Sequence, residues 1–160
     1  MSMNSEHIQF IHETIEMATE NARRGHGGPF AAMVVVGGKV AGRGVNRVTQ
    51  NNDPTAHAEV MAIRNACKEL DTFKLEGAVL YTSCEPCPMC LSAIYWARIK
   101  TIYYAADNTD AARAGFDDSF IYKEIRLPIE KRAIPAIRIE NEEAFKPFHA
   151  WISMENKIDY

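Results

Sequence analysis

Potential metal ligands are concentrated in two segments, His57-Ala58-Glu59 and Pro86-Cys87-Pro88-Met89-Cys90. Two thiolates and one imidazole can hold a zinc ion and leave the fourth tetrahedral position open to water. A carboxylate two residues after the histidine can move that water's protons without binding the ion. Because zinc lowers the pKa of bound water from about 15.7 to about 7, the pattern predicts a catalytic metal centre.

Both segments fall where a predicted loop meets a predicted helix. A helical stripe follows His57, and a second predicted helix follows Cys87 and the apolar strand expected over residues 78–82. The positive end of a helix dipole favours thiolate over thiol. Neighbouring parallel strands would bring the two helix starts together at the carboxyl edge of the sheet, where α/β domains tend to place their sites.

The order of predicted elements indicates an α/β fold. Helices are expected over residues 5–24, 57–70 and 89–98, near Ala111 and after Asn141, and strands over residues 31–36, 39–46, 78–82, 101–105 and 136–139. This order predicts a mixed five-stranded central sheet with helices on both faces, a three-layer α/β/α domain. No repeat or linker divides the chain, so residues 1–160 are expected to form a single domain.

Composition and charge narrow the function classes. The chain has 160 residues, of which 47% are hydrophobic, and a formal net charge of −3. A chain of this length can bury roughly 70% of its unfolded surface. The acidic balance argues against nucleic acid as a partner, and no apolar run approaches the ~20 residues that cross a bilayer. The start of the chain is too polar for a signal peptide, so the cytoplasm is the expected compartment.

The cysteines allow a second interpretation of the metal site. Cys84, Cys87 and Cys90 are evenly spaced, and with His57 they form the ligand set of a closed structural zinc site. That interpretation leaves Glu59 without a role. An iron–sulfur cluster needs a fourth nearby thiolate, which the pattern lacks.

Longer segments carry a resemblance to a known family. They are Gly-Gly-Pro-Phe at 27–30, Asn-Asp-Pro-Thr-Ala-His-Ala-Glu at 52–59, Ser-Cys-Glu-Pro-Cys-Pro-Met-Cys at 83–90 and Gly-Phe-Asp-Asp-Ser at 115–119, with a terminal tyrosine. H-x-E followed by P-C-x-x-C is the signature of zinc-dependent nucleobase deaminases. Together, the segments resemble the bacterial guanine deaminases of the cytidine-deaminase-like superfamily. Ala31 and the Ile158-Asp159 pair depart from the family's usual residues.

The resemblance implies hydrolysis of guanine to xanthine and ammonia in purine catabolism. Zn²⁺ would be held by His57, Cys87 and Cys90, and activated water would add to C2 of guanine. Glu59 would take a proton from the water, give it to N3 and later protonate the departing amine. The residues that the resemblance places against the purine are Asn46 and Asp118 as polar contacts and Phe30 and Trp96 as walls.

The resemblance also gives the end of the chain a role. Tyr160 would ordinarily be a frayed terminus. In this family the C-terminal segment, here residues 141–160, covers an active site, often that of a partner subunit. The expected assembly is therefore a homodimer with exchanged C-terminal segments.

Three other functions compete with this one. A tRNA adenosine deaminase shares the zinc signature, but it needs a basic surface to hold a flipped nucleotide and its phosphates. A cytosine or cytidine deaminase has no use for the Asp117-Asp118 segment. A structural zinc module would bind the metal tightly and release no ammonia from any nucleobase.

Overall fold

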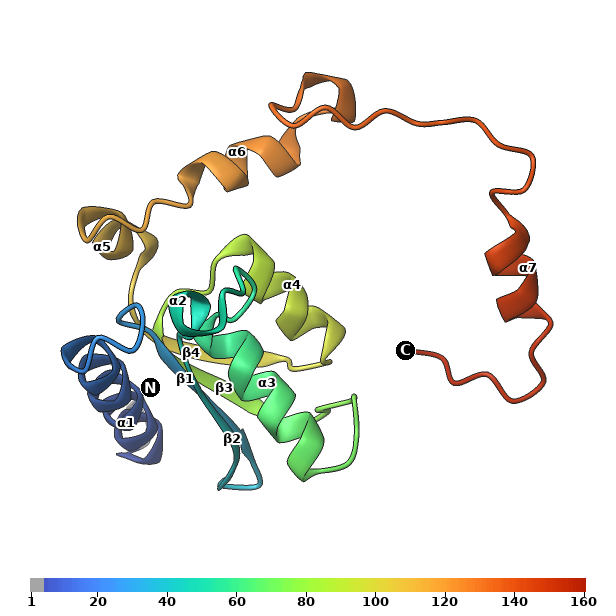
Figure 1. Ribbon diagram of the computed structural model, residues 1–160. Helices are drawn as coiled ribbons and strands as arrows, with labels where there is room; N and C mark the ends of the chain where they lie inside the picture. Colours follow the sequence, from blue (N-terminus) through green and yellow to red (C-terminus); the bar gives the residue numbers. More distant parts are fainter. Residues whose placement is uncertain (1–4) are drawn as a thin grey trace. The chain divides into compact units, whose positions relative to one another are not determined.

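The computed structural model describes residues 5–160, which divide into two compact units, one ending at Asp118 and one spanning Ser119–Tyr160 (Figure 1). The first unit contains a mixed sheet of four strands in the order β2-β1-β3-β4. The strands are β1 (Ala31–Val36), β2 (Lys39–Val45), β3 (Val79–Cys84) and β4 (Thr101–Ala106). β1 pairs antiparallel with both β2 and β3, whereas β3 and β4 run parallel.

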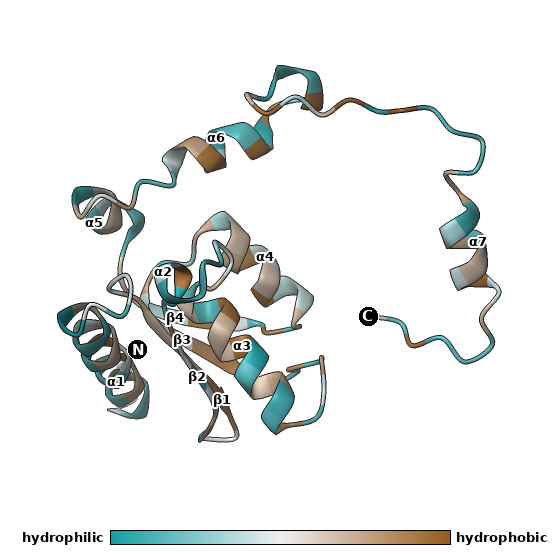
Figure 2. Cartoon of the chain, in the orientation of Figure 1, coloured by the Kyte–Doolittle hydropathy of each residue, from teal (hydrophilic) through white to brown (hydrophobic). Residues whose placement is uncertain are grey.

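Helices cover both faces of this sheet. Adjacent residues of β3 point to opposite sides, as strand geometry requires. Tyr81 packs against Phe10 of α1 (Ser5–Arg23), with ring centroids 4.9 Å apart. Leu80 belongs to the buried cluster that includes residues of α3 (Ala58–Glu69) and α4 (Pro88–Trp96). The first unit therefore has the expected three layers, with apolar strands lying between the helices (Figure 2).

Two glycines allow α3 to approach the sheet closely. A Cβ atom at Gly42 would lie 2.4 Å from the carbonyl oxygen of Ala62, and one at Gly44 would lie 2.2 Å from that of Ala58. Neither distance is compatible with a side chain. Ala58, Ala62 and Ala66 recur at every fourth position of α3 and are all fully buried, so an alanine face of the helix rests directly on the β2 backbone.

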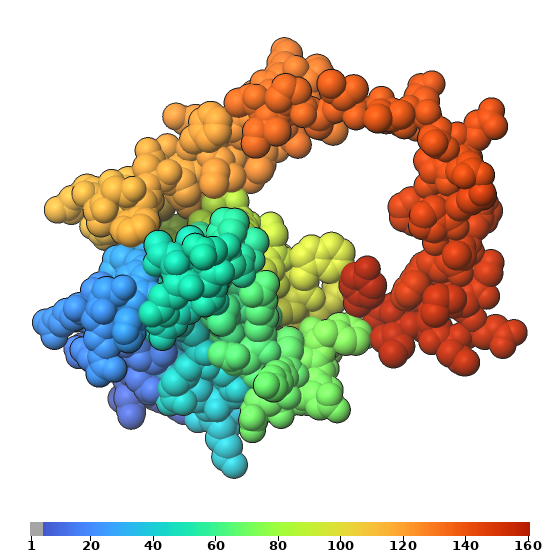
Figure 3. Space-filling model, in the orientation of Figure 1, coloured from blue at the N-terminus to red at the C-terminus, as the bar shows by residue number. Residues whose placement is uncertain are grey.

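Two short helices complete the first unit. α2 (Val48–Asn51) follows β2, in a segment whose composition predicts only a loop. Its residues form part of the molecular surface visible in Figure 3. α5 (Asn108–Arg113) follows β4 and begins with a capping box, in which the Asp107 side chain accepts hydrogen bonds from the backbone N–H groups of Thr109 and Asp110.

The second unit contains α6 (Ser119–Arg126), a short 3₁₀ turn η1 (Ile129–Lys131) and α7 (Lys146–Ile152). Pro147 stands in the first turn of α7, where its missing N–H costs no helical hydrogen bond. Many large apolar side chains of this unit are exposed, among them Phe120, Ile121, Ile125, Phe148 and Ile152.

The expectation of a five-stranded sheet is wrong for the structure as described. Residues 136–139 form no strand, and the side chains of Ile137 and Ile139 are 86% and 84% exposed. A strand forms only where a neighbour pairs with its backbone N–H and C=O groups. Within the described part of the second unit no strand offers that pairing. None of the helices that the structure describes combines the length and apolar character needed to cross a bilayer.

Candidate metal centre

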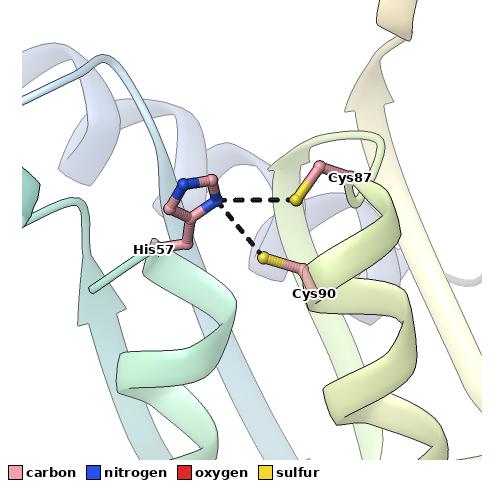
Figure 4. Close-up of side chains that lie close together, drawn as sticks. All are labelled: His57, Cys87 and Cys90. Carbon is pink, nitrogen blue, oxygen red and sulfur yellow. Dashed lines mark hydrogen bonds between the residues drawn. The ribbon is translucent and has the colours of Figure 1, made fainter. Parts of the chain in front are cut away.

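His57, Cys87 and Cys90 converge at the amino ends of two helices (Figure 4). His57 is the N-cap residue of α3, Cys87 is the N-cap residue of α4, and Cys90 lies in the first turn of α4. Pro88 fits the first position of α4 because its fixed φ angle suits a helix start. The Nδ1 atom of His57 lies 3.6 Å from the Cys87 Sγ atom and 3.5 Å from the Cys90 Sγ atom.

These separations fit a tetrahedral zinc ion. Typical Zn–S and Zn–N distances of about 2.3 Å and 2.0–2.1 Å, at a tetrahedral angle, place sulfur and nitrogen ligands about 3.5 Å apart. The three ligand atoms all lie within 4.8 Å of one another. His57, Cys87 and Cys90 are therefore positioned to bind a metal, and three protein ligands leave one coordination position for water.

The two thiols differ in acidity. Hydrogen bonding with Cys90 and the neighbouring His57 together lower the pKa of Cys87 to about 4, against the opposing effect of burial. The same hydrogen bond, together with burial, raises the pKa of Cys90. The contact with Cys87 also raises the pKa of His57. Without a metal, the site thus already holds one thiolate, the form that zinc binds.

Glu59 lies beside this group and is 6% exposed. Its Oε2 atom accepts a hydrogen bond from the Cys90 thiol at 3.3 Å. Burial raises the pKa of the Glu59 carboxyl group from its usual 4.5 to about 6. A carboxyl group whose pKa lies near neutrality can both accept and return a proton.

Cys84 is not part of the metal-binding group. Its thiol donates toward the Asp107 carbonyl oxygen at 3.6 Å, and burial raises its pKa to about 11. Among the described residues, the cluster that can hold a metal consists of His57, Cys87 and Cys90. The geometry thus argues against the closed three-thiolate site.

Asn46 is buried where β2 passes into α2, and its side chain has a defined orientation. The Oδ1 atom accepts hydrogen bonds from the backbone N–H groups of Gly28 at 3.2 Å and Val48 at 3.3 Å. Because two donors point at this atom, it must be the amide oxygen. The Nδ2 group, a donor, is therefore what Asn46 offers to a ligand.

Phe30 and Asp118 also belong to the first unit. The Phe30 ring meets the Phe116 ring edge to face, with centroids 4.9 Å apart. Asp118 is half-buried, and its pKa is raised by burial and by the nearby Cys87 thiolate. The structure thus brings Asp118 into electrostatic range of the metal-binding group.

The structure does not bring Trp96 to the metal-binding group. It ends α4, whereas the two ligands on that helix are at its start, and its side chain is 65% exposed. Tyr160 lies in the second unit, where its ring contacts Trp151 edge to face at 6.2 Å. The substrate roles of both residues remain predictions.

Two residues near the site were not singled out as site residues from the sequence. Phe116, the partner of Phe30, stands inside the Gly-Phe-Asp-Asp-Ser segment that carries the family resemblance, which is the signal that points to it. Asn21 is buried on α1, and its Nδ2 atom donates to the Asn46 carbonyl oxygen at 3.1 Å. An asparagine on the buried face of a predicted helix is the only sequence signal for it.

Comparison with known proteins identifies the class to which this fold and site belong. Residues 4–106 match the family model of the cytidine and deoxycytidylate deaminase zinc-binding region, and the chain belongs to this family. Among its relatives, the guanine deaminase of Bacillus subtilis (strain 168) is 54% identical over 154 residues, covering 96% of this chain and 99% of that protein.

One solved structure and a second relative agree with this classification. The X-ray structure of the Bacillus subtilis guanine deaminase matches with a TM-score of 0.94 over 99% of both chains. A tRNA-specific adenosine deaminase of Agrobacterium fabrum is 48% identical over 80 residues, which is 50% of this chain and 53% of that protein. The resemblance to bacterial guanine deaminases and the cytidine-deaminase-like fold are therefore confirmed.

Proposed function

We propose that this protein hydrolyses guanine to xanthine and ammonia as a step of purine catabolism. The observation that carries the proposal is the placement of His57, Cys87 and Cys90 at zinc-ligand separations, with the buried Glu59 beside them. The likeness to the Bacillus subtilis guanine deaminase extends over nearly the whole chain, whereas the likeness to the Agrobacterium tRNA-specific adenosine deaminase covers half of it. That difference favours a free purine base over tRNA.

His57, Cys87 and Cys90 would hold the zinc ion. A bound zinc supplies Lewis acidity that makes water a nucleophile near neutral pH. The chain's own contribution to the chemistry is proton transfer. Glu59 takes one proton from the attacking water and delivers it to N3 of guanine. It then takes the proton of the hydroxyl group added at C2 and gives it to the amine, so that ammonia leaves as the C2 carbonyl forms. Its raised pKa suits this alternation, because neither the acid nor the base form is strongly favoured near neutrality.

Four side chains of the first unit would recognise the purine. The Nδ2 group of Asn46 donates to an acceptor on the ring edge, and Asp118 accepts from a ring N–H group. Phe30, supported by Phe116, forms an apolar wall against the ring face. Trp96 is proposed as a second wall.

The second unit would complete the site in a homodimer. β4 lies at one end of the described sheet, and the isoleucines of residues 134–139 are exposed. Both features are expected where a partner chain supplies the missing neighbour. We assign residues 141–160 to the segment that crosses to the partner, with Tyr160 closing the purine site. None of the four cysteines forms a disulfide bond within the described residues, which suits a reducing compartment, the cytoplasm.

The function is tested by measuring ammonia release from guanine, guanosine, adenine, cytosine, cytidine and a tRNA substrate. We expect release from guanine alone at a substantial rate. The Glu59→Gln variant should fold and retain zinc but lose roughly 10²-fold or more in turnover, the usual contribution of a positioned acid–base group. Equal conversion of guanosine would contradict a site closed over the ring, and near-normal turnover by Glu59→Gln would refute the shuttle role.

A further inference from the structure

Asn21 connects α1 to the loop that holds Asn46. It is 4% exposed and lies near the end of the helix, where a long apolar side chain would be the usual buried residue. Its Nδ2 atom donates to two backbone carbonyl oxygens, that of Gly28 at 2.9 Å and that of Asn46 at 3.1 Å. An amide group has two N–H donors, and here one acceptor lies in the segment between α1 and β1 and the other in the segment between β2 and α2.

Backbone groups of Gly28 and Phe30 also form hydrogen bonds with Asn46. The N–H group of Gly28, whose carbonyl Asn21 holds, donates to Asn46 Oδ1. The N–H group of Asn46 donates to the Phe30 carbonyl oxygen at 3.0 Å, and that of Phe30 donates to the Gly28 carbonyl oxygen at 2.9 Å. The hydrogen bonds thus form a closed circuit through the two segments, and Asn21 contacts it through the Gly28 and Asn46 carbonyl oxygens.

Gly27 adds a steric limit to this circuit. Its φ angle is 154°, and a Cβ atom on it would lie 2.3 Å from the Asn46 carbonyl oxygen. The backbone of residue 27 therefore rests directly against the oxygen that Asn21 binds. With Gly27 packed on the carbonyl and Asn21 bonded to it, Asn46 has little freedom to rotate its peptide group.

We propose that Asn21 is a positioning residue for substrate binding, which acts by fixing the Asn46 amide so that its NH₂ group faces the purine. This inference rests on the proposed function and on the purine contact assigned to Asn46. Without Asn21, two carbonyl oxygens lose a donor, the loop relaxes, and Asn46 spends less time in the orientation that binds guanine. The loss falls mainly on substrate binding, because none of the hydrogen bonds of the circuit involves His57, Cys87 or Cys90.

A purely structural role predicts a different result. If the buried Asn21 contributed only to the stability of the fold, its loss would lower the melting temperature and leave KM unchanged. Thr14 provides the matched control for that effect. It lies on the same helix, is fully buried, and donates its hydroxyl hydrogen bond to the Ile11 carbonyl oxygen at 2.7 Å, away from the Asn46 loop. Thr14→Val should lower thermal stability and leave KM for guanine unchanged.

The experiment is a double-mutant cycle on the zinc-loaded full-length protein. KM and kcat for guanine are measured in Asn21→Ala, Asn46→Ala, the double variant and Thr14→Val, with zinc content and melting temperature determined for each. We expect Asn21→Ala to raise KM about tenfold, equivalent to about 1.4 kcal/mol, with kcat within a few-fold of wild type. In the Asn46→Ala background the same substitution should raise KM no further.

Two results would overturn the proposal: an unchanged KM in Asn21→Ala, or an equal rise in KM whether or not Asn46 is present. If Asn21→Ala does not yield folded protein, Asn21→Leu carries the test, because it keeps the approximate size of the side chain and removes both N–H donors without adding a charge. Failure of the proposed function would look different. In that case the wild type and Thr14→Val would release no ammonia from guanine either.

Discussion

The three cysteines near His57 differ in their surroundings, and the difference assigns them different roles. Cys87 is held as a thiolate, and Cys90 lies beside it in the same helical turn. The Cys84 thiol is directed to a backbone carbonyl, and its raised pKa keeps it protonated. A protonated thiol is a poor zinc ligand, since the metal binds the thiolate.

We therefore expect Cys84→Ser to retain zinc and activity and Cys87→Ser to lose both. Zinc bound per chain, measured by elemental analysis after dialysis, separates the two variants. The expected contrast is close to one ion against a small fraction of one. Loss of zinc from Cys84→Ser would instead revive a closed site with three thiolates.

At this scale the sequence predicts ligands better than orientations. His57, Cys87 and Cys90 are predictable because each follows a short local pattern at a helix start, and helix geometry places such residues reliably. The orientation of the Asn46 amide is not predictable, because the Gly28 and Val48 N–H groups that fix it point inward only once the chain has folded.

At the scale of elements, the contact between β2 and α3 positions the site. Gly42 and Gly44 face the fully buried alanines of α3, and α3 begins at the residue after His57. The atoms that a side chain would meet at these two positions include backbone N and O atoms of the helix, which cannot turn aside. The distance between strand and helix is therefore set by the absence of two side chains.

Gly44→Ala should destabilise the protein by about 3 kcal/mol, at the upper end for overpacking in a core. The matched control is Gly37→Ala, which adds the same methyl group where nothing lies within 4 Å and retains only the strain of a φ angle of +55°. That strain costs roughly 1 kcal/mol. Urea unfolding of both variants measures the difference, and equal losses would show that the β2–α3 contact is not tightly packed.

Elements with a strong periodic pattern are predictable, and those that depend on partners are not. β1 is predicted with its observed bounds, and α1 and β2 are predicted to within one residue, because apolar spacing and the Gly37-Gly38 turn define them locally. The strand expected at 136–139 has the right composition, but composition cannot supply the neighbour that a strand needs. α2 is missed because a single turn of helix has too few residues to show a period.

At the scale of the whole molecule, the second unit is the part whose proposed role depends on assembly. Its exposed apolar side chains include Ile158 at 67% and Tyr160 at 70%. Monomeric proteins rarely expose so many large apolar side chains, and such exposure usually marks a surface that another chain covers. The proposed exchange of residues 141–160 between subunits would provide that cover and bring Tyr160 to the partner's purine site.

Deleting residues 158–160 should lower kcat/KM for guanine at least tenfold and leave zinc content intact. Complementation with full-length Glu59→Gln tests the exchange itself. In a mixed dimer with exchanged segments, the deletion chain keeps its own Glu59 and receives the tail of its partner, so one site per dimer regains activity. No recovery after refolding the two variants together would mean that each tail serves its own subunit.

The absence of side chains at Gly42 and Gly44 of β2 also predicts a pattern that can be recognised in a sequence. Because the obstacle at Gly42 and Gly44 includes main-chain atoms of the facing helix, no change in a neighbouring side chain can make room for a substituent there. Any homologue that keeps α3 at this distance from the sheet must keep glycine at both positions. Alternate glycines in a short strand, followed by alanines at every fourth position of the next long helix, thus form a fingerprint for such close approach. It can be sought in chains that have lost every metal ligand.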